Sequence, residues 1–352
     1  MLRTRIGLVA AIAALGLTAG ACKKNENKAG TGSGTTADKS TTGDKGTTPD
    51  KGVATPVAVA GGDDLALLPV DSEMVMGLNF AQLQQSALWK QYSPALMAKI
   101  SSGLADFKAA CGFDPMEAVK SVSIGMKGLG GTTPDGAVVV HGPDKAKVMA
   151  CMDKAKAEAA KKGSEVTVDG DVFMVKDKSG QNTAFTFVND TTLLGVIGAN
   201  ASKDAVLAAA KGTSALKSSP TFVEMFSKIN TGDSLWMLMN GNSPAFSKMG
   251  SLGVKPKAIF GSVNVTDGLT LDMRIRLGTN DEAAQLVNML KGQISNPQVK
   301  QMFDKLDVAA DGTDAKFAVA MSNQKLQQLA GMMAGMMGGM MGGGGMGGAG
   351  AP

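Results

Sequence analysis

The sequence predicts an α+β protein, built as two similar tandem units of antiparallel sheet with helices packed on it. Short apolar or alternating segments follow one another through tight turns, which is typical of antiparallel strands. Longer segments carry apolar residues at helical spacing. The order strand, helix, hairpin, helix, strand, helix occurs twice, which indicates an internal duplication.

Composition divides the chain into five regions with different expected roles. They are a signal peptide at 1–21, a disordered Thr/Gly/Lys/Asp tether at 22–62, a first α+β unit at 63–212, a second at 213–331, and a Met/Gly-rich low-complexity tail at 332–352.

The first unit is expected to open with a strand over 74–79. A helix should follow, with Ser93 as N-cap, Pro94 at its first position and Gly112 after its end. The remaining strands are expected over 121–126, 137–141, 165–168, 172–176, 183–188 and 192–197, and the remaining helices over 144–162 and 203–211.

The second unit contains the clearest strand of the chain, over 269–277. Its odd-numbered residues from Leu269 to Leu277 are apolar, whereas Asp272, Arg274 and Arg276 lie on the opposite face. Asp267-Gly268 before it is a hairpin turn signal. Further strands are expected over 234–239, 258–265 and 314–321, and helices over 281–293 and 323–331.

The N-terminus has the pattern of an export signal. Arg3 and Arg5 precede an apolar run over 6–17, which is too short to span a bilayer. The following Ala-Gly-Ala-Cys22 resembles the lipobox of bacterial lipoproteins. That resemblance implies lipidation of Cys22 and an anchor in a membrane. Lys23 after the cysteine favours the outer membrane, facing the periplasm or the cell surface. Secretion is the alternative, because Ala19-x-Ala21 also fits an ordinary signal-peptidase site.

The charge balance argues against a nucleic-acid partner. The whole chain has 35 Lys and Arg against 31 Asp and Glu, but without Arg3 and Arg5 the excess is 33 − 31, or +2. The tether carries six Lys against four acidic residues, so the body over 63–352 is neutral at 27 against 27. Nucleic-acid binders concentrate positive charge instead. Within the tether, hexapeptides at 35–40, 41–46 and 47–52 repeat without bulky apolar residues, which predicts disorder.

A second resemblance concerns the start of the body. The run Leu67-Leu68-Pro69-Val70-Asp71-Ser72-Glu73-Met74-Val75-Met76-Gly77-Leu78-Asn79, continuing to Leu83, resembles the opening of uncharacterised lipoproteins common in myxobacteria and their relatives. In that family a Leu-Pro-x-Asp turn leads into a strand and then a helix. The resemblance implies an exported protein of unknown role and supplies no site residues.

The motifs of common enzymes do not occur, so no catalytic residue and no cofactor is expected. The chain has no Gly-x-Ser-x-Gly elbow, and the glycines at 128–131 lack the Gly-Lys-Ser/Thr ending of a phosphate loop. Its one histidine, His141, is expected to be an exposed residue at the end of a strand.

Two cysteines remain if Cys22 carries lipid. Cys111 and Cys151 are expected on the apolar faces of two helices, as a disulfide or as two buried thiols. Closing that loop would contribute about 4 kcal/mol in the chain-entropy model.

The tail repeats methionine pairs every four residues. The repeated residues are Met332, Met333, Met336, Met337, Met340 and Met341. Thioethers suit Cu(I) as ligands, and Met-rich segments also adhere to apolar partners. The third interpretation is a disordered tail, because the many glycines disfavour a helix.

Together these features predict a non-enzymatic lipoprotein of the cell envelope that acts as a binding or structural module. One alternative is a carrier of lipid or another hydrophobic ligand, with strand 269–277 lining a cavity. A second is periplasmic buffering of Cu(I) through the tail.

Overall fold

A computed structural model describes residues 62–129, 135–161, 163–213, 215–241, 243, 246, 255–329 and 331. The predicted signal peptide, Cys22, the tether up to residue 61 and the six methionines proposed for Cu(I) lie outside these residues. Among the helices described, none is both long and apolar enough to cross a membrane.

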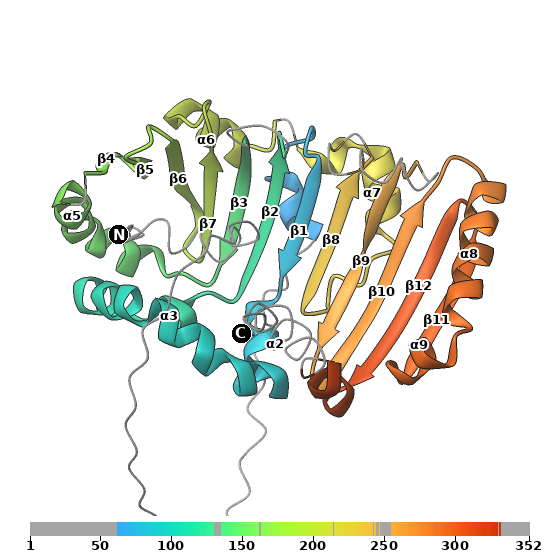
Figure 1. Ribbon diagram of the computed structural model, residues 1–352. Helices are drawn as coiled ribbons and strands as arrows, with labels where there is room; N and C mark the ends of the chain where they lie inside the picture. The colour runs from blue at the N-terminus through green and yellow to red at the C-terminus, as the bar shows by residue number, and fades with distance from the viewer. Residues whose placement is uncertain are drawn as a thin grey trace, which may run out of the picture.

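Twelve strands form one antiparallel sheet (Figure 1). Their order across the sheet is β11-β12-β10-β9-β8-β1-β2-β3-β7-β6-β5-β4. The strands are β1 Met74–Leu78, β2 Ser121–Lys127, β3 Asp135–His141, β4 Glu165–Asp169, β5 Val172–Lys176, β6 Asn182–Asn189, β7 Thr192–Ile197, β8 Leu235–Asn240, β9 Ala258–Val265, β10 Gly268–Arg276, β11 Lys305–Asp311 and β12 Asp314–Ser322. The predicted α+β class with an antiparallel sheet is confirmed.

The strands of both expected units join in this single sheet through β1 and β8. These two strands are antiparallel, with Met76 opposite Met237. On one side of them the order is β1-β2-β3-β7-β6, and on the other it is β8-β9-β10-β12-β11. On each side three consecutive strands are followed across the sheet by a hairpin that comes after a helix in the chain. The hairpin is β6–β7 after α5 on the first side and β11–β12 after α8 on the second. Strands β5 and β4 extend only the first side.

Helices cover both faces of the sheet. They are η1 Gly62–Ala66, α2 Phe80–Gln85, α3 Ala87–Cys111, α4 Pro115–Ala118, α5 Lys145–Lys161, α6 Lys203–Ala210, η2 Leu216–Ser218, α7 Pro220–Phe226, α8 Asn280–Ile294 and α9 Pro297–Gln301. Residues 323–329, after β12, are also helical. The face that η1, α6, η2 and α7 cover is called the α7 face, and the opposite face, which carries α3, is called the α3 face. Residues from α6, α7 and the central strands form one core cluster on the α7 face.

On the α3 face the helices pack at the two ends of the sheet. A second core cluster joins α2, α3 and α5 to the six strands β2 to β7. A third joins α8 to β11 and β12. The central strands lie between these two clusters (Figure 1).

The predicted start of α3 was wrong. The helix begins at Ala87, six residues before Ser93, and Pro94 lies inside it. Ser86 is the N-cap, because its side chain accepts a hydrogen bond from the backbone of Trp89. The predicted end is confirmed, since Gly112 caps the helix in the left-handed region with φ 76°.

A glycine allows the sheet to bury its largest side chain on the α7 face. Trp236 of β8 is fully buried and lies opposite Gly77 of β1. A Cβ at position 77 would lie 2.2 Å from the Trp236 indole. The indole therefore occupies the volume that any other side chain at position 77 would need.

Candidate functional site

The two central strands bury one face and leave the other partly exposed. In β1, Val75 is fully buried on the α7 face, whereas Met74 and Met76 on the α3 face stay partly exposed. In β8, Trp236 and Leu238 are buried, and the residues between and after them are again partly exposed methionines. The alternation shows that β1 and β8 are buried more deeply on the α7 face than on the α3 face.

The partly exposed apolar residues continue across five strands. Met74 and Met76 lie opposite Met239 and Met237, and the register continues from β8 through β9 and β10 to β12. We call this surface the open face. It comprises Met74, Met76, Leu235, Met237, Met239, Ile259, Val263, Val265, Leu269, Leu271, Met273, Val319 and Met321.

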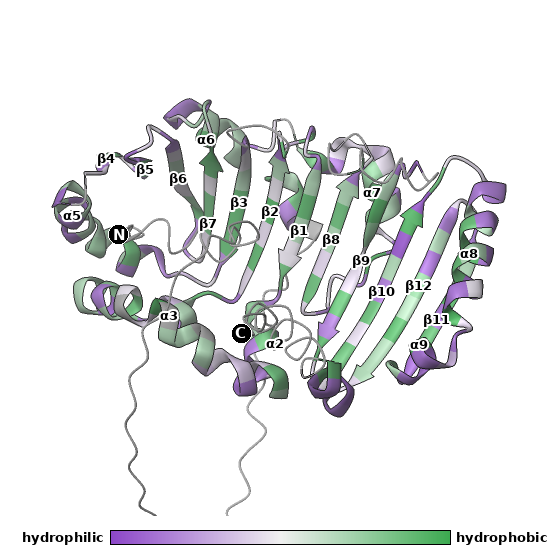
Figure 2. Cartoon of the chain, in the orientation of Figure 1, coloured by the Kyte–Doolittle hydropathy of each residue, from purple (hydrophilic) through white to green (hydrophobic). Residues whose placement is uncertain are grey.

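The open face belongs to none of the three core clusters of the described residues. The cluster under α2 and α3 reaches as far as Leu78 and Ile124, and the cluster under α8 begins at Ile275 and Phe317. Figure 2 shows green hydrophobic bands that alternate with white and purple ones along the central strands between α3 and α8. None of these thirteen residues packs into the clusters that α2, α3, α5 and α8 form with the sheet.

The size of the open face suits a polypeptide segment. Five strands about 4.8 Å apart span roughly 19 Å, and six residues of a strand rise about 20 Å. The footprint is therefore roughly 400 Å², about the length and twice the width of a short helix. This is the size of the largest apolar patch on a typical soluble protein, and such patches are often functional. Six of its residues are methionines, whose flexible thioethers fit apolar partners of different shapes.

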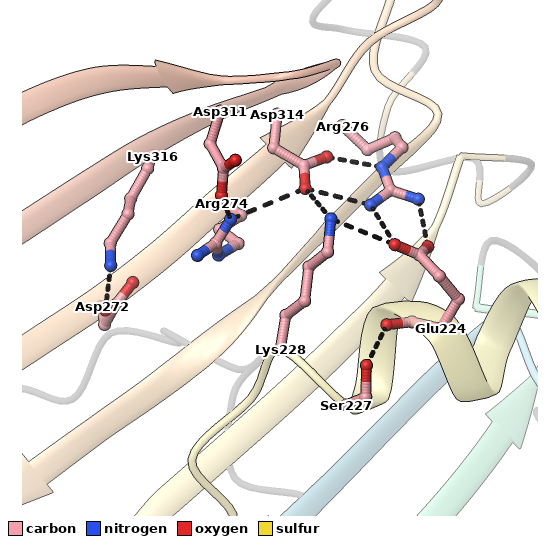
Figure 3. Close-up of polar contacts among 9 residues, drawn as sticks. All are labelled: Glu224, Ser227, Lys228, Asp272, Arg274, Arg276, Asp311, Asp314 and Lys316. Carbon is pink, nitrogen blue, oxygen red and sulfur yellow. Dashed lines mark hydrogen bonds and ion pairs between the residues drawn. The ribbon is translucent and has the colours of Figure 1, made fainter.

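A cluster of charged residues lies on the α7 face, near the C-terminal end of β10 (Figure 3). Asp314 of β12 is fully buried and accepts hydrogen bonds from Arg276, with Nη2 at 3.0 Å, and from Lys228, with Nζ at 2.9 Å. Arg276 also donates to Glu224 of α7, and Arg274 donates to Asp311.

The charges of this cluster balance. Arg274, Arg276 and Lys228 face Glu224, Asp311 and Asp314, which is three positive groups against three negative ones. Burial opposes ionisation of Asp314, but the hydrogen bonds from Arg276 and Lys228 hold its pKa below the ordinary value. The hydrogen bond from Arg276 likewise lowers the pKa of Glu224. We interpret the cluster as a structural link between α7 and the sheet.

The expectation that His141 is exposed was wrong. Its side chain is only 18% exposed, because η1 packs over the end of β3. The Nε2 atom lies 2.7 Å from Asp64 Oδ1, and Ser123 donates a hydrogen bond to the other oxygen of Asp64. A catalytic triad needs the histidine between serine and aspartate. Here the aspartate lies between them, so the geometry does not activate Ser123.

Cys111 and Cys151 lie next to each other. Cys111 ends α3, Cys151 lies in α5, and the structure joins them as a disulfide with Cα atoms 4.8 Å apart. This distance lies within the usual range for disulfides. In the described part of the chain no group of three or more His, Cys, Asp or Glu is arranged to hold a metal ion.

Two pockets within the described residues are smaller than a lipid site. One has a volume of about 50 Å³ and is lined by apolar residues around Phe107, Cys151 and Phe185. The other, of about 200 Å³, lies between α6 and η1 near Ala205 and Leu68. Sites that enclose drug-sized ligands have about 300–1,000 Å³. The residues of strand 269–277, which we expected to line a cavity, line neither pocket.

Comparisons with known proteins give little further guidance. No family model matches the chain, and no curated protein matches it. Among solved structures the chain is similar to the one described as "Structure of crystal form III of TP0453", with a TM-score of 0.40 and 10% sequence identity. The similarity covers 76% of this chain and 97% of that one.

Proposed function

We propose that the protein is a non-enzymatic, lipid-anchored binding module of the cell envelope. In this proposal the open face binds apolar segments of partner polypeptides. The observation that carries it is the contiguous, partly exposed apolar surface on five strands, which lies outside the three core clusters of the described residues. The proposed location is supported by the sequence of residues 1–22, with its export pattern and Cys22.

A polypeptide fits the surface better than an enclosed small ligand does. The two pockets described above are too small to hold a lipid chain with its headgroup. The open face instead measures roughly 19 by 20 Å, which is enough for a short amphipathic helix or a few extended residues. Its methionines suit partners that share apolar character rather than one exact sequence.

The binding proposal is tested with a fluorescent 20-residue amphipathic Leu/Lys peptide and the mature chain carrying Cys22→Ser, which needs no detergent. The double variant Leu271→Gln/Val319→Gln changes two paired residues of the open face. The matched control, Thr270→Gln/Ala320→Gln, changes the neighbouring pair on the opposite face of the same strands.

Removing two half-buried apolar contacts should weaken binding by about 2 kcal/mol, or roughly thirtyfold. The control should bind like the parent chain. Equal affinity of both variants in fluorescence anisotropy, with both folded by circular dichroism, would refute the proposal.

The anchor is tested separately in cells. Metabolic labelling with an alkyne fatty acid should tag the wild-type protein and leave the Cys22→Ser variant unlabelled. Equal labelling of both proteins, or a wild-type protein recovered unlabelled from the medium, would contradict lipidation at Cys22.

A further inference from the structure

We infer that the C-terminal segment 332–352 of the chain occupies the open face when no partner is bound. The inference deepens the proposed function and shares its site, because the segment and an apolar partner would compete for the same residues.

The described chain ends close to the open face. Met321, the penultimate residue of β12, lies on the open face opposite Leu269 of β10. Residues 323–329 then form a helix beyond the ends of these strands, drawn in dark red in Figure 1. Asn323 donates a hydrogen bond to Gln91 of α3 at 3.4 Å. Lys325 donates to the backbone oxygen of Phe303. The segment therefore starts at one edge of the open face.

The length of the segment matches the surface. It contains 21 residues, counted from 332 to 352. A flexible chain of that length has an r.m.s. reach of about 25 Å. The open face measures roughly 19 by 20 Å by strand spacing and rise. The segment can therefore extend across the whole face from its point of attachment.

The composition of the segment also matches. It has seven methionines and no charged residue, so it carries apolar groups without a desolvation cost from charge. Its glycines allow its backbone to approach the sheet closely. Six methionines lie on the open face, so thioether contacts would form on both sides of the interface.

The test is methionine oxidation by dilute hydrogen peroxide, read residue by residue by mass spectrometry. The parent is the mature chain with Cys22→Ser. The variant replaces all seven methionines of the segment by Ser and keeps the chain length. We expect Met237 and Met273 of the open face to oxidise at least threefold faster in the variant. Met289 of α8, which is 49% exposed and lies outside the open face, is the internal control and should not change.

Equal oxidation rates of Met237 and Met273 in parent and variant would overturn the inference. Protection that disappears on dilution would also overturn it, because a second copy of the chain would then be the occupant. Peptide binding to the same two proteins separates the outcomes. Faster oxidation without peptide binding supports the inference and refutes the proposed function. Unchanged oxidation, together with peptide binding that is lost in the Leu271→Gln/Val319→Gln variant, refutes the inference and supports the proposed function.

Discussion

Replacing Asp314 by Asn should destabilise the fold substantially. The carboxylate is fully buried and accepts hydrogen bonds from both Arg276 and Lys228. Removing one partner of a buried ion pair costs about 3–5 kcal/mol. The side chains of Arg276 and Lys228 are 16% and 32% exposed, so water can partly compensate and the lower value of about 3 kcal/mol applies. A folded body of about 270 residues loses roughly 2 °C of Tm per kcal/mol, which gives a decrease of about 6 °C.

The matched control is Asp311→Asn. Asp311 pairs with Arg274 in the same cluster, but its side chain is 58% exposed. Exposed ion pairs contribute about 1 kcal/mol or less, so Tm should fall by at most about 2 °C. Differential scanning calorimetry at pH 7 measures both variants. A Tm of Asp314→Asn within 1 °C of wild type, or equal losses in the two variants, would refute the structural role of the cluster.

The lowered pKa of Asp314 predicts that the fold loses stability in acid. The pKa of Asp314 is held below its ordinary value of 3.8 in the folded state. The stability that the ionised Asp314 contributes is therefore fully present above about pH 4. It is lost as the pH falls through the lower pKa of the folded state. Between pH 5 and pH 3 the urea midpoint of the wild type should fall more steeply than that of Asp314→Asn. Parallel curves would contradict the assignment.

Two further predictions concern packing and redox state. Gly77→Ala should lower the free energy of unfolding by about 1–3 kcal/mol, because a Cβ would lie 2.2 Å from the Trp236 indole. Urea unfolding followed by tryptophan emission measures the loss. An unchanged midpoint would show that β1 and β8 can separate freely. Reduction of the disulfide between Cys111 and Cys151 should cost about 4 kcal/mol, since the bond closes a loop of 40 residues. Alkylation of both cysteines in unreduced, denatured protein, detected by mass spectrometry, would show that the bond is absent.

Much of the fold was predictable because its elements have strong local periodicity. β5, β7 and β9 match the predicted ranges, and α5 differs by one residue at each end. β11 was missed because it buries only Val308 and alternates weakly. The start of α3 was missed because Ser93-Pro94 is a stronger local signal than Ser86, which is the actual N-cap.

The site was predictable only in part. The alternation in 269–277 correctly separated an apolar face from one with Arg274 and Arg276. It did not reveal which face the helices cover, since that depends on the order of all twelve strands. The partner of Arg276 lies 38 residues away in β12, and no local pattern connects the two residues. The two arginines of this strand, Arg274 and Arg276, were the one sequence feature that could have predicted a buried carboxylate nearby.

The most direct test of the open face is to locate a bound apolar peptide on the protein. The Leu/Lys peptide, synthesised with photo-leucine, is irradiated with the mature Cys22→Ser chain, and mass spectrometry maps the cross-linked residues. We predict cross-links concentrated on β8, β9 and β10, at residues such as Met237, Val263 and Leu271. Cross-links confined to the α7 face or to the outer surfaces of α3 and α8 would contradict the central claim.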